Sequence, residues 1–90
     1  MKQLRVKFSN GRTYHIPVDV IAQSRARYYE SLGENYVEEV HECLKDNYMI
    51  VDWVFNNMDW ADVSDEAVLC EEPSLDIEDE EWPNVEHEIV

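Results

Sequence analysis

The sequence predicts an α+β domain in which a three-stranded antiparallel sheet, made of a β-hairpin and a later strand, is covered on one face by about three helices. Three observations support this prediction. Apolar and basic residues alternate over residues 4–8, which is the period of a half-buried strand. From residue 18 the apolar spacing changes to that of amphipathic helices. A short apolar run at residues 67–70, bounded by acidic residues, supplies the third strand.

The register of the hairpin follows from the need to keep its apolar residues on one face. A three-residue loop that ends with Gly11 in the left-handed conformation pairs Leu4 with Ile16 and Val6 with Tyr14. A two-residue turn would instead leave two apolar residues on the charged face, so we predict the longer loop. The polar face of the hairpin then carries Arg5, Lys7, Thr13 and His15.

The three helices are expected between residues 18 and 57. Gly33 suits the position just after the first helix. Asn35, with Glu38 three residues later, resembles a capping box that opens the second helix. Asp46 or Asn47 is expected to cap the third helix.

After the third helix we expect a loop that packs onto the core through Trp60 and Val63. The two cysteines, Cys43 and Cys70, lie in a helical and a strand pattern, and both are predicted to be buried, reduced thiols. No apolar run is long enough to span a bilayer, and the first residues do not have the pattern of an export signal. We therefore expect a cytoplasmic protein without membrane contact.

The composition divides the chain into two parts. We expect residues 1–73 to form one compact domain, because ninety residues suit a single core. Residues 74–90 contain seven acidic residues and no Lys or Arg, a composition typical of a solvated, flexible tail. Apolar residues are spaced through this tail, however, so it could also dock along the domain or on a partner.

The charge is strongly negative and unevenly distributed. The chain has seven Lys and Arg and 21 Asp and Glu, which gives a net charge of −14. Six of the basic residues lie within residues 1–29, and twenty of the acids lie within residues 30–90. Such a field repels nucleic acid and membranes and favours a basic partner. Alternatively the acids only keep the protein soluble, or the basic end contacts nucleic acid, or its cations bind the protein's own acids and part of the tail.

No catalytic, cofactor or metal motif is found. Glycine occurs only at positions 11 and 33, which excludes a glycine-rich phosphate loop. His41 and Cys43, two residues apart on a helix, do not face each other as a nucleophile and base would. Neither the Cys-x-x-Cys nor the His-x-x-x-His spacing of a zinc site occurs. We therefore expect a binding protein and not an enzyme.

The candidate binding residues form a row of acids. Glu34, Glu38 and Glu42 are spaced by four residues on the second helix, beside Glu39, and their carboxylates repeat about every 6 Å. This spacing is similar to that of phosphates along a nucleic-acid strand, so a groove lined with Arg and Lys could accept the row. The row could extend over Asp46, Asp52, Asp59, Asp62, Glu71 and Glu72. An ordinary solvated helix face is the alternative interpretation.

Several segments resemble small uncharacterised acidic accessory proteins of tailed bacteriophages. They are VKFSNG at residues 6–11, IP at 16–17, IA at 21–22, RARYY at 25–29, DW at 52–53, NNMDW at 56–60 and DV at 62–63. The resemblance implies an accessory protein made in the host cytoplasm, of a class that often inhibits host factors, in some cases as a DNA mimic. The implied partner is a basic host protein such as a nuclease, a restriction or CRISPR component, or a polymerase.

A second hypothesis uses apolar contacts in place of charge. The protein could be a structural or assembly module, for example a homodimer, that binds through exposed Trp60, Trp82 and the tyrosines.

Overall fold

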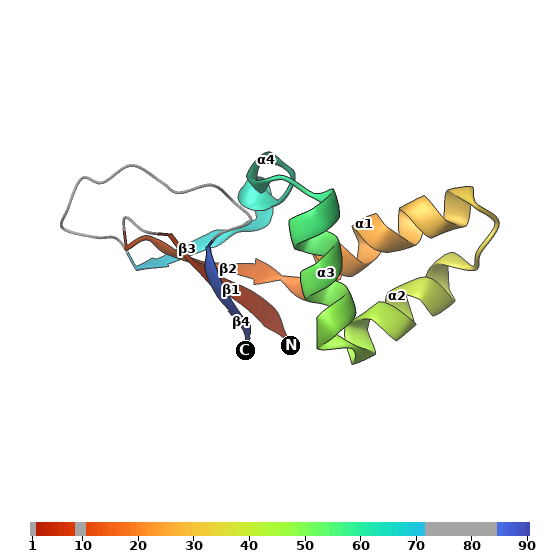
Figure 1. Cartoon of the computed structure of the whole chain (residues 1–90), viewed down its shortest axis with the longest axis horizontal. Coiled ribbons are helices and arrows are strands. Elements are labelled where there is room, and N and C mark those ends of the chain that lie inside the picture. The colour runs from red at the N-terminus through yellow and green to blue at the C-terminus, as the bar shows by residue number, and fades with distance from the viewer. Residues whose placement is uncertain (1, 9–10, 72–84) are drawn as a thin grey trace.

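The computed structural model describes residues 2–8, 11–71 and 85–90 and has the predicted α+β architecture. The elements follow one another as β1 (Gln3–Lys7), β2 (Thr13–Pro17), α1 (Val18–Ser31), α2 (Tyr36–Lys45), α3 (Asn47–Asn57), α4 (Trp60–Val63), the 3₁₀ turn η1 (Ser64–Glu66), β3 (Val68–Glu71) and β4 (Glu86–Ile89). In Figure 1, α1 and α2 form a hairpin that extends away from the sheet, and α3 lies between this hairpin and the strands.

The sheet is antiparallel throughout, with the strand order β3-β2-β1-β4 (Figure 1). The predicted hairpin register is confirmed, because Leu4 pairs with Ile16 and Val6 pairs with Tyr14. Gly11 has a φ of 89°, in the left-handed region that the three-residue loop requires. The later strand, β3, pairs with β2 as predicted.

The prediction of three strands was wrong by one, since β4 pairs with the free edge of β1. This strand comes from the segment assigned to the acidic tail. Val85 is buried in the core and Ile89 pairs with Leu4, so apolar burial fixes both ends of β4. Arg5 Nη1 donates to Glu88 Oε1 at 2.6 Å, which confirms that a hairpin cation binds part of the tail. Residues 74–84 lie outside the described residues, and their expected flexibility stays a prediction.

The helix ends have the predicted cap residues, and of the expected Asn35–Glu38 capping box the structure shows the hydrogen bond to the Asn35 side chain. At the end of α1 the Gly33 and Glu34 N–H groups donate to the Glu30 and Tyr29 carbonyls, which is a Schellman motif with Gly33 at φ 97°. The α2 helix begins after Asn35, whose side-chain oxygen accepts a hydrogen bond from the Glu38 N–H at 3.0 Å. These local bonds satisfy backbone groups that helix termini leave free.

The segment after α3 differs from the predicted loop. Trp60–Val63 forms the short helix α4, because the Asp59 and Asp62 side chains form a capping box with each other's backbone N–H groups. The expected packing is confirmed: Val63 is fully buried and Trp60 packs against the core.

The helices share one core with one face of the sheet. The buried side chains of the sheet include Leu4, Val6 and Ile16, and those of the helices include Ile21 and Ile50. Around them lie Phe8, Val18, Ala22, Cys43, Val54, Met58, Val63 and Val85.

The prediction that both cysteines are buried is correct for Cys43 and wrong for Cys70, which is exposed. Cys70 lies on the edge strand β3, at an irregularity in the register opposite Thr13 and Tyr14. A residue at such a bulge is turned away from regular pairing, so the strand pattern alone did not determine its burial.

Candidate partner-binding surface

The α1–α2 hairpin carries the acid face, which we define as Glu34, Glu38 and Glu42. All three side chains are exposed. Glu38 and Glu42 lie one turn apart on α2, as predicted. Glu34 was also predicted on this helix but lies before the cap residue Asn35, so the helical row contains two glutamates and the third precedes it in the turn.

The acid face has little internal charge compensation. The Lys45 Nζ lies 4.0 Å from Glu42 Oε1, but both side chains are about two-thirds exposed, so the pair contributes little. Among the described residues, no basic side chain forms an ion pair with Glu34 or Glu38. Glu38 lies in the first turn of α2, where the positive end of the helix dipole offsets its repulsion from Glu42.

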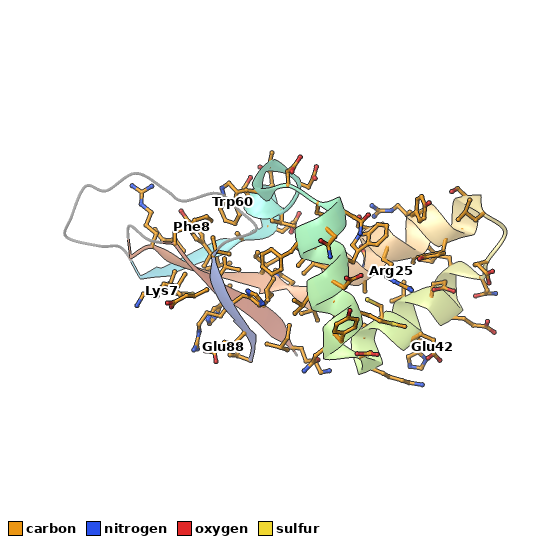
Figure 2. The ribbon with its side chains drawn as sticks, viewed as in Figure 1. Lys7, Phe8, Arg25, Glu42, Trp60 and Glu88 are labelled. Carbon is orange, nitrogen blue, oxygen red and sulfur yellow. The ribbon has the colours of Figure 1, made fainter. Side chains whose placement is uncertain are left out.

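Glu39 differs from its neighbours on α2 because it points toward α1. Its Oε2 accepts a hydrogen bond from Arg25 Nη1 at 2.7 Å, and the two side chains are only 21% and 14% exposed. The Arg25 guanidinium lies 4.5 Å from the centre of the Tyr29 ring. Figure 2 shows Arg25 beside α2 and Glu42 on its outer side. Glu39 therefore links the two helices and is not available to a partner.

The same region contains the buried thiol of Cys43 on α2. Burial raises the pKa of Cys43, and the negative charges of Asp46 and Glu39 act in the same direction, while Arg25 opposes them. A buried thiol with a raised pKa is a poor nucleophile, so the residue fits a core position better than a catalytic one.

The predicted acids beyond α2 have mainly structural roles. The Asp46 carboxylate caps α3 by accepting hydrogen bonds from the Tyr48 and Met49 N–H groups. Asp52 Oδ1 accepts a hydrogen bond from Asn56 Nδ2 at 2.9 Å. As described above, Asp59 and Asp62 cap α4.

The ten predicted acids therefore do not form one continuous row. They are spread over α2, α3, α4 and β3, and Figure 1 shows α2 and β3 on opposite sides of α3. Glu71 ends β3, and Glu72 lies outside the described residues. Among the described acids, the structure places Glu38 and Glu42 one turn apart on α2 and Glu34 in the turn before it. A sequence shows where carboxylates are, but not which N–H groups donate to them.

Two further basic residues bind within the protein, as one of the alternatives predicted. Lys2 Nζ donates to the Leu44 carbonyl at 3.0 Å and to Asn47 Oδ1 at 2.9 Å, at the C-terminal end of α2. A cation at this position also complements the helix dipole. Arg5 Nε donates to His15 Nε2 at 3.1 Å while its Nη1 holds Glu88.

The polar face of the sheet contains a groove that the sequence analysis did not find. Its volume is about 560 Å³, and its described lining includes Arg5, Lys7, His15, Glu86 and Glu88. Acids of β4 here lie beside bases of β1, so the groove presents both signs of charge. Alternation of Glu86 and Glu88 opposite Arg5 and Lys7 was the available sequence signal. Thr13, predicted on this face, lines the groove but is buried.

The aromatic residues named in the second hypothesis occupy different environments. Trp60 is half-buried, with its ring 5.0 Å from Phe8 and 4.8 Å from Tyr14, so most of it faces the core (Figure 2). Tyr28 and Tyr48 are exposed. Trp82 lies outside the described residues.

Comparison with protein-family models, curated proteins and solved structures found no match. Within residues 2–8, 11–71 and 85–90, no group of three or more His, Cys, Asp or Glu side chains is placed to hold a metal ion. No helix in this part of the chain is long and apolar enough to span a bilayer.

Proposed function

We propose that this protein acts without catalysis, by binding a basic macromolecule through the acid face. The partner that suits it best is a host nuclease, a restriction or CRISPR component, or a polymerase whose groove normally holds nucleic-acid phosphates. The proposal includes a phage origin and action in the host cytoplasm, where such a protein would inhibit its partner as a phosphate mimic. The observation that carries it is that Glu34, Glu38 and Glu42 are all exposed and that, among the described residues, only Lys45 forms an ion pair with any of them.

The chemistry of the acid face supports this proposal. Carboxylates accept charge-assisted, often bidentate hydrogen bonds from Arg, as phosphates do. Five of the other predicted acids, Glu39, Asp46, Asp52, Asp59 and Asp62, already accept hydrogen bonds inside the protein. The acid face keeps its carboxylate oxygens available to a partner. The net charge of −14 adds long-range attraction, which accelerates association with a basic partner and makes it sensitive to salt.

The test is affinity capture from bacterial lysate at low salt and at about 0.5 M salt, where screening shortens to a few ångströms. We expect a nucleic-acid-binding protein that elutes with salt. Its affinity should be lost in the reversal variant Glu34→Lys/Glu38→Lys/Glu42→Lys. The proposal fails if this variant remains folded by circular dichroism and binds as well as the wild type.

A matched control separates the acid face from net charge. The variant Glu30→Lys/Asp52→Lys/Glu86→Lys makes the same change in charge at exposed positions outside the acid face. It should slow association while retaining most of the affinity, because it leaves the contact itself intact. Equal loss of affinity in both variants would mean that the partner responds only to total charge.

A second candidate function rests on an apolar patch at the tip of the same hairpin. Tyr28, Leu32 and Val37 are all more than half exposed around the α1–α2 turn. Burial of this patch between two copies would make the protein a homodimeric assembly module. A dimer that persists at high salt in sedimentation experiments, and is lost on Leu32→Ser/Val37→Ser substitution, would favour this function over the acid-face proposal.

A further inference from the structure

The strand β3 forms one edge of the sheet and has an apolar outer side. In the order β3-β2-β1-β4 it pairs only with β2, and no described strand lies on its other side. Val68 is 61% exposed and Leu69 is 43% exposed. The edge therefore combines an outer side that no described strand pairs with and exposed apolar side chains.

The opposite edge of the same sheet is polar. The side chains of Glu86, His87 and Glu88 on β4 are all exposed. Charged side chains on an edge strand are the usual protection against pairing with another chain. In β3 the first three residues, Val68, Leu69 and Cys70, carry no charge, and the only acid of the strand is Glu71 at its end. The contrast marks β3 as the edge that can accept another strand.

An added strand would gain apolar contacts on both faces of the sheet. Consecutive residues of a strand point to opposite faces, so Val68 shares a face with its partner His15, and Leu69 shares the other with Tyr14. The register irregularity next to Tyr14 interrupts regular pairing toward Glu71. The regular part of the edge is thus short and centred on Val68 and Leu69.

The charges around β3 determine which occupant fits. Asp65 and Glu66 precede the strand and are exposed, and Glu71 ends it. Antiparallel pairing of β3 with a second copy would bring the Glu66 end of one chain to the Glu71 end of the other. Like charges opposite one another destabilise a strand pair, so a second copy fits poorly. A strand with Lys or Arg at its ends would place opposite charges there.

We propose that the outer edge of β3 binds an extended segment of another protein by strand addition, and that this segment has apolar residues flanked by Lys or Arg. Backbone hydrogen bonds would supply part of the affinity, and the alternating side chains would supply the specificity. The site is distinct from the acid face on α2 and does not depend on the function proposed for it.

The test starts from a displayed library of random linear peptides, selected on the whole protein. We expect enriched peptides with alternating apolar residues between Lys or Arg. Titration of one such peptide into isotopically labelled protein should shift the amide resonances of Val68 and Leu69 most. Substitution Val68→Thr/Leu69→Thr preserves strand propensity and charge, and should weaken peptide binding by about tenfold or more.

The controls separate this site from others. Val90→Thr removes an exposed apolar side chain at the end of the opposite edge strand β4 and should leave the peptide affinity unchanged. Asp65→Asn/Glu66→Gln should weaken binding and reduce its dependence on salt, whereas Glu38→Gln/Glu42→Gln on the acid face should change neither. Circular dichroism verifies that each variant is folded.

Three results would overturn the proposal. They are a library without enriched peptides, enriched peptides without basic residues, and unchanged affinity in the folded Val68→Thr/Leu69→Thr variant. Sedimentation gives an independent check on the occupant. A wild-type dimer that becomes monomeric in the same double variant would show that a second copy, and not a basic segment, occupies the edge.

Discussion

The role of Glu39 can be tested by the substitution Glu39→Gln, which preserves the shape of the side chain and removes its charge. The Arg25 guanidinium would then lose its counter-charge while still largely buried between the helices and Tyr29. Hydrogen bonds to charged groups contribute about 1.5–3 kcal/mol. Since both side chains retain some contact with solvent, we expect the free energy of unfolding to fall by about 2 kcal/mol, near the lower part of this range.

The assay is urea denaturation at neutral pH, followed by circular dichroism, with Glu42→Gln as the matched control. Glu42 lies on the same helix but is 65% exposed and 4.0 Å from its cation, so its loss should cost less than about 0.5 kcal/mol. In thermal unfolding of the same variants each kcal/mol shifts Tm by about 4–8 °C, which separates the two variants clearly. The effect of Glu39→Gln should largely persist in high salt, because partly buried pairs are screened less than exposed ones.

Unchanged stability in Glu39→Gln would refute the assignment of this residue to the helix interface. If the same variant also lost affinity for the captured partner, Glu39 would belong with the acid face, as the sequence first suggested. A stability loss that matches Glu42→Gln would likewise show that the Arg25–Glu39 pair behaves as an ordinary surface pair.

Three other predictions concern the two cysteines and Gly33. The exposed Cys70 should react rapidly with a thiol reagent, whereas the fully buried Cys43 should react only as fast as the domain opens. Equal reaction rates would contradict the burial of Cys43. Burial raises the pKa of Cys43 in the folded state, so the thiol stabilises the fold below the ordinary thiol pKa of about 8.5 and this stabilisation falls as the pH rises beyond it. In urea titrations the free energy of unfolding of the wild type should therefore fall more between neutral and alkaline pH than that of Cys43→Ala. Gly33→Ala should lower the free energy of unfolding by about 1 kcal/mol in the same urea assay, because a φ of 97° is strained for alanine although open space surrounds the added methyl group. An unchanged urea midpoint would count against the Schellman motif.

The parts of the fold that the sequence predicted correctly depend on local rules. The register of the hairpin followed from alternation, and the caps at Gly33, Asn35 and Asp46 followed from side chains that bond to nearby backbone. Each of these signals acts within a few residues, so it can be read without knowing the tertiary structure.

The parts that could not be predicted depend on contacts between distant residues. Strand β4 lies in a run of acids that resembles a solvated tail, and Arg5, which pairs with Glu88, is 83 residues away in the chain. The same limit applies to the candidate site, where Glu38 and Glu39 look equivalent in sequence. Only the position of Arg25 on α1 distinguishes Glu39, which is 21% exposed, from the exposed Glu38.

The two proposed surfaces can be tested separately because a helix lies between them. Figure 1 shows α2 and β3 on opposite sides of α3, and a helix with its side chains is about 10–12 Å across. The Debye length at physiological ionic strength is about 8 Å, so exposed charges on α2 are largely screened at β3. The salt dependence of peptide binding at β3 must therefore arise mainly from nearby acids such as Asp65 and Glu66. That of partner binding at α2 must arise mainly from the acid face.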